Sequence, residues 1–135
     1  MYKLSDPLGL GCCDDDYEDC MRYREHIPSG LSLKAIEHNL IGFETLFNNG
    51  YGYGFDDLLK DLGHNDIQQE MQLKIDKAKQ SLADVNKSLV EMYQDDPEKV
   101  LRIHSEISAI VDFLSSDVAT VLSIKEPYID CPGGD

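Results

Sequence analysis

The sequence predicts an all-α protein, an up-and-down helical bundle with two long antiparallel helices, one medium helix, one short helix and an irregular N-terminal segment. Apolar side chains recur every three or four residues through most of residues 32–121, which is the spacing of amphipathic helices. Glycines and an Asp-Pro-Glu tripeptide interrupt these runs, as expected where one helix ends and the next begins. We therefore expect three regions: an irregular acidic segment with cysteines (1–26), a helical bundle domain (27–125) and a C-terminal tail (126–135).

The first helix is expected to begin with Ser32 as its N-cap and to end near Asn48. Its apolar stripe consists of Leu33, Ile36, Leu40, Phe43 and Phe47, widened by Ile41 and Leu46. A short second helix follows, with its apolar residues at Phe55, Leu58, Leu59 and Leu62. Gly63 stands where a left-handed residue commonly closes a helix.

The third helix is predicted to be long, up to 28 residues from Asp66 to Tyr93, with Asn65 or Asp66 as its cap. Its apolar residues alternate by three and four as in a heptad seam, at Ile67, Met71, Ile75, Ala78, Leu82, Val85, Leu89 and Met92.

The fourth helix is expected after Asp96, which can cap it, because a proline at the first position and an acid in the first turn follow. Its apolar stripe is Val100, Ile103, Ile107, Ile110, Leu114, Val118 and Val121. At 1.5 Å per residue, the third and fourth helices would each span about 40 Å and can pair antiparallel along their whole length.

The charge of the chain argues against a nucleic-acid partner. The 135 residues fit one domain and carry 26 acidic against 12 basic side chains, a formal charge of -14, with no basic stripe to contact phosphates. No window approaches the roughly 20 apolar residues of a transmembrane segment. The first twenty residues also lack the apolar core of a signal peptide.

The four cysteines lie outside the periodic region, at Cys12, Cys13, Cys20 and Cys131. Three states are open: a disulfide that joins the first cluster to Cys131, free thiols, or a thiolate metal site, although the spacing is not the paired C-x₂-C of zinc sites. Oxidised cysteines would indicate an extracytoplasmic location.

The stretch NGYGYGFDD, from Asn49 to Asp57, is interpreted as a connection between two helices. A phosphate cradle would need a preceding strand, or a lysine after the glycines, and neither is present. The glycines provide backbone freedom for a reversal, and a substitution at Gly52 or Gly54 should cost stability where that glycine has a positive φ.

The same region provides the candidate ligand or partner surface. Tyr51 and Tyr53 are amphipathic side chains suited to such a surface. Asp56 and Asp57 belong to the first turn of the next helix, where they also favour its positive end. His38 lies beside the apolar stripe of the first helix, where a boundary position is the alternative to a ligand-binding role. No metal site is predicted, because no H-E-x-x-H pair occurs and a partial EF-hand pattern from Asp14 has Asp19 where the turn needs glycine.

The order of LIGFETLF, the glycine-rich loop, GFDDLLKDLGH and two long amphipathic helices resembles the C-terminal half of imelysin-like proteins. The resemblance covers residues 27–135 and includes Asp117–Ile124, whereas residues 1–26 depart from the family pattern. It implies an all-α protein of an extracytoplasmic family that is named for an insulin-cleaving peptidase and associated with iron uptake. The full-length family looks like two related bundles facing each other, with a G-x-H-x-x-E motif in the N-terminal half.

That motif is absent from this chain. Gly63-His64 is its nearest approach, and it lacks the spacer and the glutamate, so no catalytic or metal residue and no cofactor is carried over. Two functions are then open. One is a non-catalytic, ligand- or partner-binding domain of a cell-envelope protein linked to iron uptake. The other is a component of a metallopeptidase whose separate half carries the motif.

The predicted helices also suggest assembly. Three long apolar stripes and one short one do not close a four-helix core, so part of the apolar face of the third helix should be uncovered. We expect either a homodimer or a second bundle half to cover it.

Overall fold

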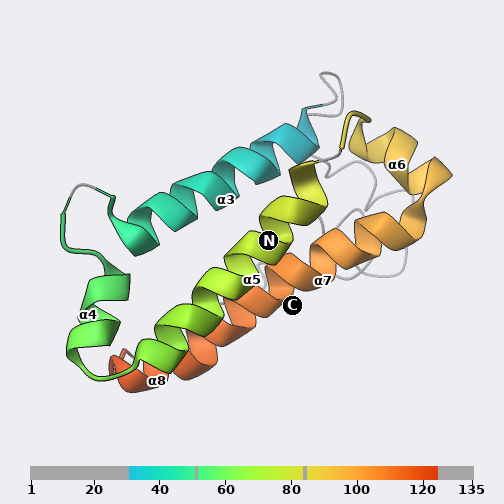
Figure 1. The fold of residues 1–135 in the computed structure, drawn as a ribbon. Helices are drawn as coiled ribbons and strands as arrows, with labels where there is room; N and C mark the ends of the chain where they lie inside the picture. The colour runs from blue at the N-terminus through green and yellow to red at the C-terminus, as the bar shows by residue number, and fades with distance from the viewer. Residues whose placement is uncertain (1–30, 51, 84, 125–135) are drawn as a thin grey trace, which may run out of the picture.

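The computed structural model describes residues 31–50, 52–83 and 85–124. Within these ranges the protein is all-α and has no strand, as predicted (Figure 1). The helices are α3 (Ser32–Asn48), α4 (Phe55–Asp61), α5 (Asn65–Ala83), α6 (Leu89–Asp95), α7 (Pro97–Phe113), the π-helical turn η2 (Leu114–Val118) and α8 (Ala119–Val121). The acidic N-terminal segment, the C-terminal tail, all four cysteines and Tyr51 lie outside the described residues.

Helix α5 is the central element of the bundle. It runs antiparallel to α7 on one side and lies along α3 on the other, while α4 joins the end of α3 to the start of α5 (Figure 1). Leu59 of α4, Met71, Ile75 and Ala78 of α5 and Ile103 of α7 have no exposed surface. Burial of these apolar side chains is the main driving force for packing the helices together.

The predicted third helix is in fact two helices. Helix α5 ends at Ala83, and α6 starts after Ser88, which forms a capping box with Glu91. The Ser88 hydroxyl accepts a hydrogen bond from the Glu91 amide (3.3 Å), and the Glu91 carboxylate accepts one from the Ser88 amide (2.8 Å). The prediction of one helix was wrong because Leu89 and Met92 are buried and so continue the apolar period across the break. The S-x-x-E spacing was the available signal.

The start of the fourth helix is confirmed, but its apolar register changes near the end. Asp96 accepts a hydrogen bond from the amide of Lys99 (3.0 Å), and the proline follows at the first position. Phe113 and Val118 are buried five residues apart, whereas Leu114, predicted in the stripe, is 38% exposed. The π turn of η2 accommodates this five-residue step, because its hydrogen bonds join residues five apart.

Smaller corrections concern the ends and edges of helices. Ser32 is the first residue of α3 rather than its cap, because the Leu31 carbonyl accepts the amide of Ala35 at 2.9 Å. Helix α5 begins at Asn65 itself, because the carbonyl of His64 accepts the amide of Gln68. Neither Asn65 nor Asp66 is therefore the cap that the sequence predicted. Gly63 has φ +86°, as predicted for the end of α4. Ile41 and Leu46 point away from the core and are exposed.

The uncovered face expected on the third helix is not found. Met71, Ile75, Ala78 and Leu82 of α5 are each at most 4% exposed. The break after Ala83 contributes to this, because Leu89 and Met92 of the separate helix α6 pack into the same core.

Truncating the core should destabilise the fold much more than removing a surface charge. Ile103→Ala removes a side chain with no exposed surface, so we expect a loss of about 2 to 5 kcal/mol in the free energy of unfolding. Lys87→Ala should be near neutral, because Lys87 and its ion-pair partner Asp95 are both more than half exposed. Urea denaturation measures both variants. Equal losses would contradict the assignment of the core.

Candidate functional site

The reversal between α3 and α4 is made by an asparagine and not by a glycine. Asn49 has φ +33°, and its amide donates to the carbonyl of Thr45 at 2.8 Å. Its side-chain amide donates to the carbonyl of Tyr53 at 3.1 Å. Gly50, Gly52 and Gly54 all have φ outside the left-handed region, so the positive φ considered for Gly52 or Gly54 is absent.

Gly54 is needed for a different reason, which is close packing of the backbone. A Cβ at this position would lie 2.6 Å from Asp56 Oδ1, 2.7 Å from the carbonyl oxygen of Phe47 and 2.8 Å from the carbonyl carbon of Asn48. Two of these neighbours are backbone atoms of the last turn of α3. The start of α4 can therefore press against the end of α3 only because this residue has no side chain.

The first turn of α4 is held by two carboxylates that share one ammonium group. Asp57 accepts a hydrogen bond from the amide of Gly54 (3.3 Å), as in a capping box. Lys60 Nζ lies 2.8 Å from Asp56 Oδ2 and 3.3 Å from Asp57 Oδ1. Asp56 is only 8% exposed, and its Oδ1 has no hydrogen-bond partner in the described part of the chain.

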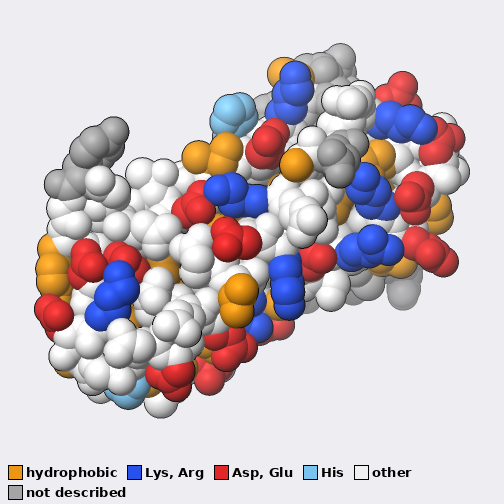
Figure 2. All heavy atoms as spheres, in the orientation of Figure 1, with side chains coloured by type: hydrophobic (Ala, Val, Ile, Leu, Met, Phe, Trp, Pro, Cys, Tyr) orange, Lys and Arg blue, Asp and Glu red, His pale blue; other side chains and the backbone are white. Residues whose placement is uncertain are grey.

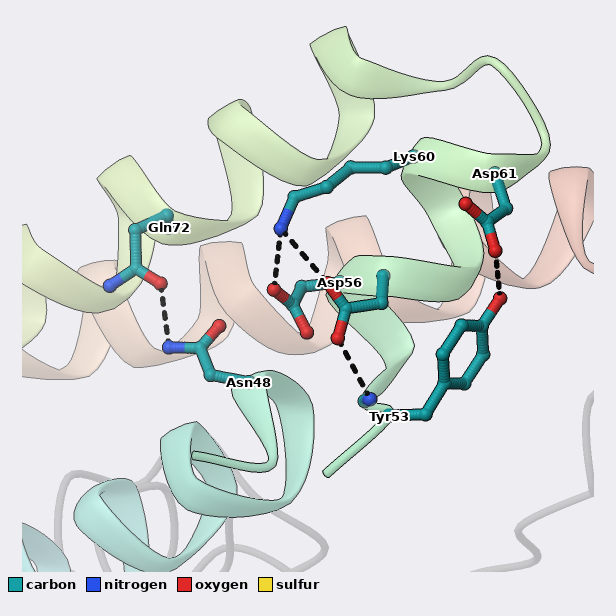
Figure 3. A network of polar contacts seen from close by, with 8 residues as sticks. Asn48, Tyr53, Asp56, Lys60, Asp61 and Gln72 are labelled. Atoms are coloured by element: carbon teal, nitrogen blue, oxygen red, sulfur yellow. Dashed lines mark hydrogen bonds and ion pairs between the residues drawn. The ribbon is translucent and has the colours of Figure 1, made fainter. Parts of the chain in front are cut away.

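Tyr53 presents an exposed ring in a fixed position. The side chain is 61% exposed, and its hydroxyl donates a hydrogen bond of 2.6 Å to Asp61 Oδ2 at the end of α4 (Figure 3). The hydrogen bond to Asp61 raises the pKa of Tyr53 above its ordinary value, and desolvation and the nearby negative charges act in the same direction. The phenol thus stays protonated and serves as a donor.

A polar network joins this region to α5. Asn48 donates to Gln72 at 3.0 Å (Figure 3), and Gln72 donates to Glu44 at 3.3 Å and to Asp76 at 3.0 Å. Lys79 also forms an ion pair with Glu44 (2.6 Å). We call residues 48–50 and 52–61, together with Gln72, the α3–α4 corner. This link between α3 and α5 could not be predicted from the sequence, because its bonded partners are 24 to 35 residues apart.

The structure brings some of the candidate residues together. Tyr53, Asp56 and Asp57 lie in the α3–α4 corner, whereas His38 is exposed further back on α3. Over the ranges that the structure describes, no three His, Cys, Asp or Glu side chains stand close enough to hold a metal ion.

His104 on α7 is a partly buried histidine outside this corner. Burial lowers the pKa of His104, and its Nδ1 lies 3.5 Å from the Ser108 hydroxyl. The hydroxyl donates to the His104 carbonyl (2.8 Å), a local bond within the helix. His104 thus lies at the boundary between the core and the surface of α7.

Comparison with known proteins places the chain in a family. Residues 3–116 match the family model for imelysin. The chain belongs to the imelysin family. Neither a curated protein nor a solved structure matched it. The matched range includes most of the N-terminal segment that we expected to depart from the imelysin pattern, and it stops before Asp117–Ile124.

The family's G-x-H-x-x-E element was tested against the residues present. His64 directly follows Gly63, and the third residue after His64 is Ile67, so neither the spacing nor the acid fits. The described residues also lack a cluster of three metal-binding side chains. A metal site of the imelysin type therefore does not fit this part of the chain. None of the helices described has the length and apolarity needed to cross a bilayer.

Gly54→Ala should destabilise the protein, and Gly50→Ala is its matched control. The added methyl at Gly54 meets backbone closer than 3 Å, which costs about 1 to 3 kcal/mol, as other overpacked sites do. At Gly50 a Cβ meets nothing within 4 Å, and its φ is ordinary. Thermal melts of both variants test this. Indistinguishable melting temperatures would refute the close approach of α4 to α3.

The Tyr53–Asp61 hydrogen bond predicts a titration shift. Asp61→Asn should move the pKa of Tyr53 down towards its ordinary value, because the charged acceptor and its repulsion of the phenolate are lost. A raised folded-state pKa means that the stabilising contribution of this bond is present below about pH 10 and lost as the pH rises through the folded pKa. NMR of the tyrosine ring carbons follows this residue, and an unchanged titration would contradict the bond.

Proposed function

We propose that the chain is a non-catalytic helical domain of an imelysin-like protein of the cell envelope, and that it binds a ligand or partner in a process linked to iron uptake. The main observation in support of this proposal is the exposed ring of Tyr53, whose hydroxyl is held by a hydrogen bond to Asp61 within the α3–α4 corner. Family membership supports the imelysin-like assignment. The extracytoplasmic location follows from the resemblance.

The rigidity of the α3–α4 corner favours binding. Asn49 donates a hydrogen bond to the carbonyl of Tyr53, and Asp61 accepts one from the Tyr53 hydroxyl. The ring therefore loses little conformational entropy when a ligand contacts it. Phe55 and Leu62, at the two ends of α4, are also about half exposed. Tyrosine and phenylalanine are enriched at the centres of protein interfaces.

The charge of the corner indicates which chemistry a partner would have. Asp56 and Asp57 share the single ammonium of Lys60, and Asp61 accepts only the Tyr53 hydroxyl in the contacts observed. An excess of carboxylate around an aromatic ring suits a cationic group on the partner. The chain as a whole carries a formal charge of -14, which would steer a basic partner towards it.

The alternative is that the chain is a component of an imelysin-type metallopeptidase. This function would need a separate half that carries the G-x-H-x-x-E motif, because the motif does not occur in these 135 residues. The two proposals predict different results for the purified chain. The alternative is favoured if the chain gains bound metal and cleaves insulin only when such a half is added, and it is overturned if addition of that half produces neither.

A photo-cross-linker in place of Tyr53 tests the binding function. Tyr53→p-benzoylphenylalanine keeps an aromatic ring at the corner, and the same replacement at Gln94, exposed on α6 near the far end of the bundle, is the control. In cells of the native host, adducts should form at position 53 and not at 94, and should increase when iron is withheld. The adduct at 53 should weaken when Asp57→Asn is added.

Equal cross-linking at the two positions would refute the corner as the binding surface. If the yield of adducts at position 53 does not change when iron is withheld, the link with iron uptake is refuted. Mass spectrometry identifies the cross-linked molecule in each case.

A further inference from the structure

Asn49 and Gly50, the first two residues after α3, form an Asn-Gly pair, and no other asparagine of the chain precedes a glycine. Asparagine before glycine is the pair most prone to spontaneous deamidation, because glycine has no side chain to hinder attack by its backbone nitrogen. Both residues are exposed, and the loop between α3 and α4 lies at the surface at one end of the bundle (Figure 2). Water therefore reaches the pair.

Deamidation of such a pair is an intramolecular acyl transfer. The Gly50 nitrogen attacks Cγ of Asn49, a C–N bond forms, and the Cγ–Nδ2 bond breaks. The proton of the Gly50 amide passes through water to the side-chain nitrogen, which leaves as ammonia. Water then opens the resulting five-membered imide at either carbonyl, so position 49 becomes an aspartate or an isoaspartate. The reaction needs no reagent except water, but the Gly50 nitrogen must reach Cγ.

The backbone conformation of Asn49 holds the reacting atoms apart. Its ψ is +66°, and Cβ is offset from the backbone nitrogen by about 120° around the Cα–C bond because Cα is tetrahedral. The nitrogen of Gly50 is therefore anti to the Cβ of Asn49, whereas the imide ring needs the two atoms on the same side. Ring closure thus requires a rotation of about half a turn around the Cα–C bond.

Hydrogen bonds of Asn49 oppose that rotation. Its carbonyl accepts from the amide of Gly52 at 2.8 Å, and its side-chain amide donates to the carbonyl of Tyr53 at 3.1 Å. A Cβ at Gly52 would lie 3.1 Å from Nδ2 and 3.8 Å from Cγ of Asn49, so the asparagine side chain lies over Gly52. Both bonds must break before Cγ can meet the Gly50 nitrogen.

We propose that Asn49 is a latent deamidation site, which the closed α3–α4 corner protects and a local opening of that corner activates. The residues whose bonds must break are all exposed, namely Asn49, Gly52 and Tyr53. Phe47 and the rest of the core can therefore stay in place during the opening. Segments with few buried contacts open at a much lower free energy than the whole domain.

The product of the reaction cannot close the corner again. A carboxylate at position 49 has no proton to donate to the carbonyl of Tyr53, so two oxygens would face each other in place of the hydrogen bond. An isoaspartate also lengthens the main chain by a methylene group within the reversal. Deamidation therefore releases Tyr53 from one of its two hydrogen bonds, and the change in the corner is irreversible.

The rate of deamidation measures the protection by the fold, and it needs no partner, so the outcome is independent of the proposed binding function. The full chain and a synthetic peptide with the sequence of residues 45–54 are kept in mildly alkaline buffer. Mass spectrometry of digested samples follows the conversion of Asn49. The full chain should react at least about tenfold more slowly than the peptide. Equal rates would overturn the proposal.

Gly50→Ala is the control for the chemistry. A Cβ at this position meets nothing within 4 Å, so the variant should keep the fold. The added methyl group hinders the attacking nitrogen, so the same change in the peptide should slow the conversion of Asn49 at least about tenfold. A peptide with this change that reacts as fast as the unaltered peptide would overturn attack by the Gly50 nitrogen as the mechanism.

Two corner variants and one core variant show whether the opening is local. Gly54→Ala crowds α4 against α3, and Asp57→Ala removes the acceptor of the Gly54 amide, so each should accelerate the reaction of Asn49 at least about threefold. Ile103→Ala weakens the core within α7 and should leave the rate unchanged, with circular dichroism confirming that each variant is folded. The proposal is overturned if both corner variants react at the rate of the unaltered chain, or if Ile103→Ala accelerates the reaction as much as they do.

Discussion

The architecture depends on the burial of one face of α5. Met71, Ile75 and Ala78 are fully covered because α3, α4, α7 and η2 all pack on this helix. A helix that provides apolar contacts to several neighbours fixes their positions relative to each other, since protein interiors are close-packed and resist small shifts. The position of α4, and with it the α3–α4 corner, follows from Leu59, whose side chain is buried against the same core.

The corner is then locked by a backbone constraint. Gly54 lets the first turn of α4 lie against the last turn of α3, and Asn49 makes the reversal between them. With both helix ends fixed, the side chain of Asp56 is enclosed while Tyr53 remains outside. The same short loop therefore produces a buried acid paired with Lys60 and an exposed aromatic ring, which is how a rigid scaffold presents a binding residue.

Local signals in the sequence predicted the elements well, and contacts between distant residues set the rest. The apolar period predicted the ends of α3 and α4 to within about one residue. The Asp-Pro-Glu tripeptide predicted the start of α7, and Gly63 predicted the end of α4. Periodicity failed at residues 85–88, because a buried stripe can continue through a break that only the Ser88–Glu91 cap marks.

The candidate site was predictable in composition but not in geometry. Of the candidate residues from the sequence, Asp56 and Asp57 share Lys60 and Tyr53 bonds to Asp61 of the same helix, whereas His38 lies elsewhere on α3 and Tyr51 is outside the described residues. The sequence did not show whether Gly54 is needed for a positive φ or for close backbone contact, because glycine serves both purposes. It also did not reveal the Asn48–Gln72 bond, which depends on how α3 packs against α5.

The attachment of α3 explains why an apolar face is left outside. Towards its C-terminus, α3 is joined to α5 by polar contacts, which are the Glu44–Lys79 ion pair and the Asn48–Gln72 hydrogen bond. Phe47 is buried there, while its neighbour Leu46 is 73% exposed. Adjacent helix positions are about 100° apart, so with Phe47 in the core and Glu44 and Asn48 on the flank that meets α5, Leu46 is left on an outer side of the helix. The exposure of Ile41 and Leu46 is thus a consequence of how α3 is held against α5.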